Sequence, residues 1–259
     1  MILQDKLPFI PWMDPRSARL PGIQPLESGD WLRVDEAFAA QMAERDRLIA
    51  TIPQDVCAQT PQGAAATREL YGMVLDKLRG TPGYDVRAAE VVRPDGVIVP
   101  LDPEAPMATL GRLVQEDLCL MQADGSGEHV LTAAALCFPA SWTLAQKIGR
   151  PLTTIHIPVK VYDETMARRV QRLFDAIRVE QPMWRMNYLI YDDAELHQPR
   201  REGSPRPRPV RRDLVRTERQ CLVRLPQTQA VLFAIHTWVV PIAKLPPDAA
   251  AALLALYPA

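Results

Sequence analysis

The spacing of apolar residues predicts mainly helices in the first half of the chain. Leu110, Leu113, Val114 and Leu118 recur at intervals of three and four residues, which is typical of one face of a helix. Asp35 is a suitable N-cap for the run that follows it, and Gly80 is a suitable helix end. The predicted helices of this half cover residues 31–50, 63–80 and 107–121.

The second half of the chain mixes strand and helix patterns. Val215, Thr217 and Arg219 alternate with Arg216 and Glu218, as expected for a strand. The predicted strands cover residues 128–138, 183–191, 214–225 and 230–241, and the predicted helices cover residues 162–177 and 246–257. Helices followed by strands mixed with helices indicate an α+β fold, with a small antiparallel sheet covered on one face.

Proline-rich segments divide the chain further. Residues 1–34 read as an irregular arm, because proline at this density prevents regular helix. Residues 35–259 then form one domain, interrupted at 198–212 by a mobile loop rich in arginine and proline. Three interpretations of this loop remain open: a solvated loop, a nucleic-acid-binding arm, and a docking surface for an acidic partner, for which an electron-transfer protein is our hypothesis.

Composition narrows the class of protein. The 259 residues carry a net charge of -1, so no overall field attracts nucleic acid or an anionic membrane. We expect a soluble cytoplasmic protein, because the N-terminus does not resemble a signal peptide and no apolar run approaches a membrane span. The four cysteines lie far apart, which favours isolated buried thiols over a zinc or iron–sulfur site.

Candidate chemistry centres on one histidine, because the sequence contains no GxGxxG, P-loop, HExxH or GxSxG motif. His156 lies between two isoleucines and just before Pro158. A neutral imidazole in apolar surroundings suits a haem ligand. The alternative is a core histidine that is hydrogen-bonded to the backbone.

Five segments together resemble one family in their order and spacing. They are GRLVQEDLCLM (111–121), CFPASWTLAQKIGRPLTTIHIPV (137–159), WRMNY (184–188), RTERQCLVRLP (216–226) and AVLFAIHTW (230–238). The chain resembles the haem-dependent oxidative N-demethylase family over roughly residues 25–246. The resemblance implies a PAS-like antiparallel sheet with helical additions at both ends.

The resemblance also implies an activity. Similar proteins are the haem-binding subunits of dimethylamine monooxygenases, oxidoreductases that contain haem b and release formaldehyde from an N-methyl group. Their electrons come from NADPH through flavin and a [2Fe–2S] cluster on other polypeptides. A haem-based gas or redox sensor and a cofactor-free scaffold of the same fold are the alternatives, because fold does not fix function.

The resemblance assigns candidate site residues. His156 is the candidate iron ligand, and His236 is the second candidate. Arginines that could bind the haem propionates are Arg150, Arg185, Arg219 and Arg224, and tryptophans that could pack on the porphyrin are Trp142 and Trp184. Three carboxylates could pair with a cationic amine and accept its proton: Glu116, Asp117 and Glu218. Glu116 and Asp117 are neighbours in the third predicted helix, so at most one of them can face a given cavity.

Overall fold

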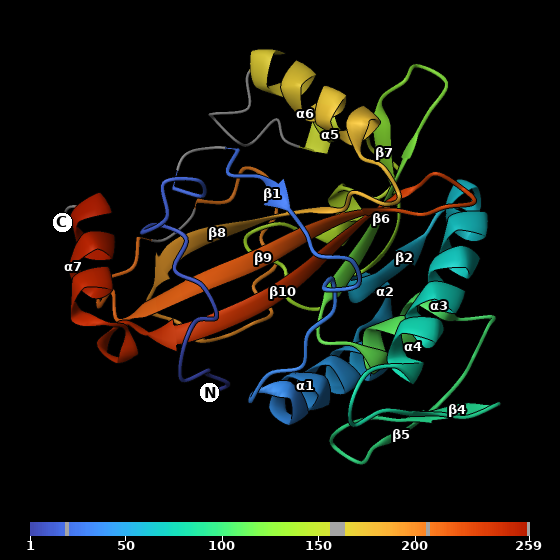
Figure 1. Ribbon diagram of the computed structural model, residues 1–259, viewed down its shortest axis with the longest axis horizontal. Coiled ribbons are helices and arrows are strands. Elements are labelled where there is room, and N and C mark those ends of the chain that lie inside the picture. Colours follow the sequence, from blue (N-terminus) through green and yellow to red (C-terminus); the bar gives the residue numbers. More distant parts are fainter. Residues whose placement is uncertain (19–20, 156–163, 206–207, 258–259) are drawn as a thin grey trace.

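The computed structural model describes residues 1–18, 21–155, 164–205 and 208–257. Over this part of the chain it shows an α+β fold, which confirms the predicted class (Figure 1). A seven-stranded sheet has the strand order β1-β8-β9-β10-β6-β7-β2, and every neighbouring pair in it is antiparallel. A small second sheet has the order β3-β4-β5.

Four of the strands, β7 to β10, lie where the sequence predicted strands. The main sheet consists of β1 (Gln24–Pro25), β2 (Cys57–Gln59), β6 (Asp117–Ala123), β7 (His129–Ala135), β8 (Met183–Tyr191), β9 (Leu214–Arg224) and β10 (Val231–Pro241). The second sheet consists of β3 (Asp85–Val86), β4 (Glu90–Val92) and β5 (Ile98–Pro100). This small sheet carries no strand pattern long enough to be recognised in the sequence.

The helices agree with the predicted ones in most places. They are α1 (Phe38–Thr51), α2 (Pro53–Val56), α3 (Ala64–Arg79), α4 (Pro106–Leu113), α5 (Leu152–Ile155), α6 (Glu164–Ala176) and α7 (Pro247–Leu256). Asp35 is not the N-cap of α1, because the helix begins later and Asp35 instead accepts a hydrogen bond from the Ala37 amide in the preceding turn. None of the helices within the described ranges could span a bilayer.

The helix predicted over 107–121 is wrong in its second half. Helix α4 ends at Leu113, Val114 is extended, and β6 begins at Asp117. Both faces of β6 are buried, so its apolar residues do not alternate with polar ones, and their spacing matched a helix by coincidence. Glu116 therefore precedes a central strand, and Asp117 begins it.

The main sheet has two faces that carry different layers. Side chains on β9 and β10 alternate between them, so Arg219 and His236 lie on one face while Arg216 and Glu218 lie on the other. The first face is covered by the N-terminal arm, α3, α4 and α7, and we call it the arm face (Figure 1). Trp12 of the arm packs there and donates its indole N–H to the Ala249 carbonyl of α7.

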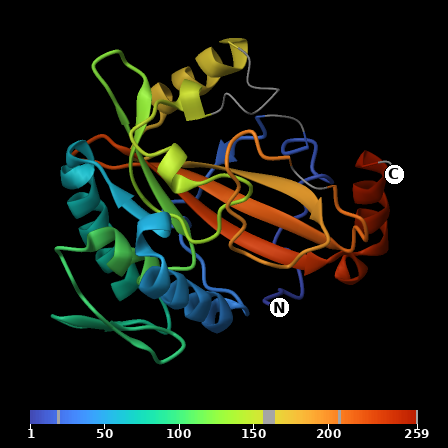
Figure 2. The same ribbon diagram turned by 180° about the vertical axis from the view of Figure 1, so that it is seen from behind.

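The opposite face, which we call the rear face, is covered by α5, α6 and two irregular segments. Figure 2, which views the sheet from this side, shows residues 136–150 and 192–205 crossing in front of it. Two apolar clusters lie at its ends: one includes Cys119, Leu222 and Phe174 of α6, and the other includes Phe138 and Leu196. The polar residues of β8 and β9 that face this side lie between the two clusters.

The close approach of Gly63, the residue before α3, to β7 gives a testable prediction. A Cβ added at Gly63 would lie 2.5 Å from the Thr132 carbonyl oxygen, so Gly63→Ala must displace backbone. We expect it to lower the free energy of unfolding by about 1–3 kcal/mol. Gly72→Ala is the control, because nothing lies within 4 Å of its added Cβ and alanine favours helix by about 0.5–1 kcal/mol. Urea unfolding followed by circular dichroism measures both, and equal effects would contradict the prediction.

Candidate functional site

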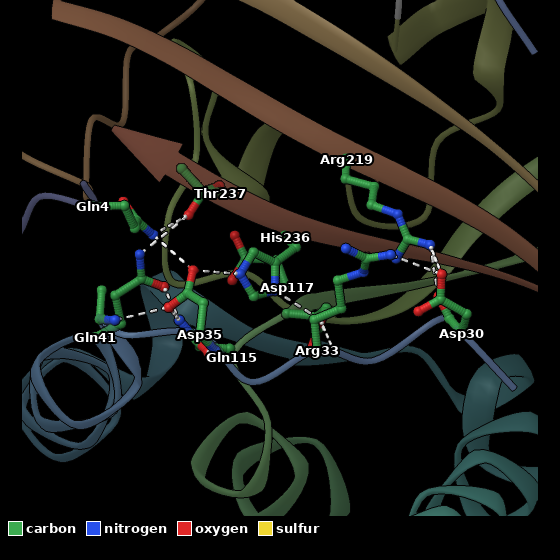
Figure 3. A network of polar contacts seen from close by, with 12 residues as sticks. Gln4, Asp30, Arg33, Asp35, Gln41, Gln115, Asp117, Arg219, His236 and Thr237 are labelled. Carbon is green, nitrogen blue, oxygen red and sulfur yellow. Dashed lines mark hydrogen bonds and ion pairs between the residues drawn. The ribbon is translucent and has the colours of Figure 1, made fainter. Parts of the chain in front are cut away.

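A buried network on the arm face surrounds His236. Its Nδ1 lies 2.8 Å from Glu116 Oε1. Its Nε2 lies 3.1 Å from Asp35 Oδ2, and Figure 3 shows these two side chains facing each other. Burial lowers the pKa of His236, but the two carboxylates outweigh burial and raise that pKa above its ordinary value. The ring is therefore an imidazolium that donates both of its N–H groups. It has no nitrogen left for iron, so His236 as the structure places it does not fit the role of second candidate ligand.

This network also fixes the arm and the start of α1. Asp35 accepts further hydrogen bonds from the Gln4 and Gln115 side chains, at 3.0 and 2.7 Å. Burial raises the pKa of Asp35. The hydrogen bond and positive charge of His236, together with the hydrogen bonds from the two glutamines, outweigh burial and lower that pKa overall. Glu116 Oε1 also accepts the Arg33 amide at 2.8 Å. Glu116 thus holds the arm to the sheet and does not face the rear.

Asp117, on the neighbouring position, forms a second and separate ion pair. Its Oδ1 lies 2.7 Å from Arg45 Nη1, and the two side chains are 1% and 0% exposed. The backbone amides of Cys137 and Phe138 donate to its two oxygens at 2.7 and 2.9 Å. Its partners are a buried arginine and two backbone amides, so both carboxylate oxygens are already occupied. This geometry fits a structural role for Asp117 better than the role of a catalytic base.

The rear face carries a group of polar side chains that we call the polar belt: Arg185, Asn187, Arg216, Glu218 and Gln220. Glu218 Oε2 accepts hydrogen bonds from Asn187 Nδ2 at 3.0 Å and from Gln220 Nε2 at 3.1 Å. Among the described residues, its Oε1 has a single long contact, of 3.5 Å, with Arg216 Nη2. Arg216 makes its shorter bonds, of 2.6 and 3.0 Å, to two backbone carbonyls. The carboxylate of Glu218 is thus held firmly through one oxygen and weakly through the other.

Arg185 is the second unusual member of the belt. It is half-buried, its Nε is inaccessible and unpartnered, and its guanidinium makes no hydrogen bond or ion pair with the part of the chain that the structure describes. Burial lowers the pKa of Arg185, and the nearby charge of Glu218 only partly opposes this. A cation desolvated without a partner is costly, which marks Arg185 as a group that fits an anionic ligand.

The other predicted arginines do not converge on this site. Arg219 lies on the arm face, where it donates to Asp30 at 2.7 Å. Arg224 donates to the backbone carbonyls of Phe174 and Ile177 at the end of α6. Arg150 is exposed at the surface. Of the four candidates, only Arg185 is half-buried without a hydrogen-bond or ion-pair partner among the described residues.

The two candidate tryptophans lie on opposite faces of the sheet. Trp184 lies on the arm face, with its ring centroid 5.4 Å from that of Phe9 and the Arg219 guanidinium above it. Trp142 is half-buried against the rear apolar cluster. Only Trp142 shares a face with the polar belt.

His156 lies outside the described residues, so its assignment stays a prediction. The residue before it, Ile155, ends α5 and packs against the rear apolar cluster. Lys147 Nζ donates to the Ile155 carbonyl at 2.5 Å. Ile155, the last described residue before this gap, thus packs on the same face of the sheet that carries Arg185 and Glu218.

Sequence reasoning did not single out Asn187, Arg216, Gln220 or Lys147. The alternation of β9 placed Arg216, Glu218 and Gln220 on one face, which was the available signal. Both faces of this strand carry charged residues, so the pattern could not tell which charges pair internally. Only the register of β8 on β9 brings Asn187 opposite Glu218 and Arg185 opposite Gln220.

An α+β fold with a few polar groups on a largely apolar face is typical of a small-molecule site. The chain matches the sequence model of the family described as haem-dependent oxidative N-demethylase, alpha subunit-like, over residues 22–256. It belongs to that family, as its sequence motifs predicted. Haem dependence and oxidative chemistry are the properties that the family name carries.

Proposed function

We propose that the chain is the haem-binding catalytic subunit of an oxidative N-demethylase that acts on a small methylated amine such as dimethylamine. Family membership supports the haem dependence and the oxidative chemistry. The observation that carries the proposal is the polar belt, where a guanidinium without a partner among the described residues and an incompletely paired carboxylate share one face. The strand order β7-β6-β10-β9-β8 supports the PAS-like arrangement that the resemblance implies.

The residues of the rear face fit a haem. A propionate is the kind of anion that the unpartnered Arg185 guanidinium binds, through charge-assisted hydrogen bonds. Met183, Phe233 and Trp142 supply half-buried apolar surface beside it for a porphyrin ring. We assign Arg185 to a propionate and keep His156 as the proposed iron ligand. When bound, the haem supplies the activation of O2 with electrons from a donor.

Glu218 is the group that we assign to the substrate. A small methylated amine is a cation near neutral pH, and the weakly paired Oε1 of Glu218 can accept a hydrogen bond from its N–H. The same oxygen can take the proton that the amine must lose before it is oxidised. Asn187 and Gln220 hold the other oxygen, so they orient the carboxylate.

The proposed overall reaction balances with an external electron donor. The N-methyl group and O2, with two electrons and two protons, yield formaldehyde, the demethylated amine and water. We propose that the electrons come from NADPH through flavin and [2Fe–2S] groups on separate subunits. The role of this chain is to bind the amine, exclude water from the rear face and hold the proton acceptor in place.

An absorbance spectrum of the purified protein tests the proposal directly. We expect a Soret band that shifts when dimethylamine is added. Glu218→Gln should keep the band and bind dimethylamine at least about tenfold more weakly, since it loses a charged hydrogen-bond partner. Glu180→Gln is the control, because Glu180 is exposed.

Three other outcomes would contradict the proposal. A protein that stays colourless after addition of hemin would favour the scaffold alternative. A Soret band that no methylated amine perturbs would favour a sensor. An unchanged dimethylamine affinity in Glu218→Gln would remove Glu218 from the substrate site while leaving the haem assignment in place.

A further inference from the structure

Positive charge is concentrated in one region of this nearly neutral protein. Residues 147–213 contain 14 basic and 9 acidic residues, whereas the rest of the chain contains 16 basic and 22 acidic ones. This region includes α6 and the arginine–proline loop 198–212. The molecule therefore carries opposite charges in different parts, which the net charge of -1 conceals.

Most of the described arginines before residue 113 are ion-paired, whereas several exposed arginines of residues 147–213 are not, although Arg211 pairs with Asp213. Seven arginines before residue 113 form an ion pair with a nearby carboxylate, not counting the fully buried Arg45: Arg16, Arg33, Arg47, Arg79, Arg87, Arg93 and Arg112. Arg169 and Arg172 of α6 and Arg201 and Arg208 of the loop are exposed and have no such pair among the described residues. Exposed, unpaired guanidinium groups are available to an acidic partner.

These arginines belong to the layer that covers the rear face. Lys147 forms an ion pair with Glu202 of the loop, and it also donates to the carbonyl of Ile155, the residue before His156. The Glu202 amide donates to Gln146 Oε1 at 3.1 Å, and the Ser141 amide donates to the Gln198 carbonyl at 3.0 Å. The loop is thus attached to segment 136–150 over the rear face (Figure 2).

Helix α6 is attached to the same face from its other side. Phe174 of α6 and Ile177, just beyond it, are buried in the rear apolar cluster, which leaves the arginine-bearing side of the helix to solvent. Gln171 Nε2 donates a hydrogen bond to His129 Nδ1 of β7 at 2.7 Å, which fixes the helix against the β6–β7 hairpin. The helix and the loop therefore present their arginines from structures that pack beside the polar belt.

We infer that Arg169, Arg172, Arg201 and Arg208 form a docking surface for an acidic electron-transfer protein. The inference rests on the proposed function, because only a haem subunit needs an external electron donor next to its rear face. Opposite charges increase the rate of encounter and are screened by salt, so docking should weaken steeply as ionic strength rises. Nucleic acid is the competing partner, because clustered arginines also bind phosphates.

A plant-type [2Fe–2S] ferredoxin with an acidic surface serves as the probe. Two measurements are made at low and at near-physiological salt: ferredoxin binding by calorimetry, and haem reduction by reduced ferredoxin in a stopped-flow instrument. We expect Arg201→Gln/Arg208→Gln and Arg169→Gln/Arg172→Gln each to weaken binding and slow reduction by about tenfold at low salt. Reduction by dithionite and the haem content should not change.

Arg68→Gln is the matched control, because Arg68 is exposed on α3, which packs on the arm face. Ferredoxin affinity equal to wild type in both double variants would overturn the inference. So would tighter binding of a duplex DNA probe than of ferredoxin at near-physiological salt. Ferredoxin binding can be measured without haem. A colourless protein would therefore contradict the proposed function, and the binding measurement would still test the docking surface.

Discussion

Replacing Asp117 with asparagine is expected to lower the free energy of unfolding by about 3–5 kcal/mol, because it leaves the buried Arg45 guanidinium without a counter-ion. Arg45 is 0% exposed, and its Nε already donates to the Gly111 carbonyl at 2.8 Å. The new amide would also present an N–H₂ group to one of two backbone N–H donors, at Cys137 or Phe138. The loss therefore combines an unpaired charge with a broken hydrogen bond.

A double-mutant cycle separates these contributions. Arg45→Met and the double variant, unfolded in urea alongside Asp117→Asn, give the coupling energy between the two side chains. The control is Asp76→Asn, whose partner Arg79 is 56% exposed and whose loss should cost no more than about 1 kcal/mol. A loss of the same size at both sites would show that the buried pair has no special role in holding α1 to the start of β6.

Replacing His236 with glutamine is expected to destabilise the protein by a similar amount, about 3–5 kcal/mol near pH 6, and to change how its stability depends on pH. The carboxylates of Glu116 and Asp35 raise the pKa of His236 in the folded protein. Its contribution is therefore complete below the unfolded pKa of about 6.5 and is lost as pH rises through the folded pKa. The pKa of Asp35 is lowered, so its contribution is lost only at acid pH, as pH falls through its folded pKa.

Urea unfolding at about pH 6 and about pH 9 tests this directly, because the wild type should lose stability between them through His236. In His236→Gln that His-linked loss should disappear. His197→Gln is the control, because its described ring contact is one hydrogen bond to the Cys137 carbonyl at 2.8 Å. If the difference in stability between His236→Gln and wild type were the same at both pH values, His236 would not be the titrating group.

Much of the fold was predictable because long elements repeat one signal many times. Strand β8 and helix α3 lie within a residue or so of the predicted ranges. The failure at residues 114–121 has a clear cause, because LCLM is buried on both faces of its strand and shows no alternation. Helix and strand patterns cannot be told apart in so short an apolar run.

The candidate site was predicted only in part. Glu218 and Arg185 were among the candidates, but so were Glu116, Arg219 and His236, which the structure places in the arm-face network. These residues have the same chemistry in the sequence. They differ in whether a partner from a distant segment satisfies them, as Asp35 does for His236.

The sequence by itself determined the α+β class, the family, most of the helices and strands, and the residue types from which a haem and amine site could be built. These follow from local spacing and from motifs that lie within single segments. Only the tertiary structure decided which charges are neutralised within the protein and which remain available. That decision depends on strand register and on the approach of the arm, whose Asp30 meets Arg219 from 189 residues away. Short-range pattern does not encode such contacts.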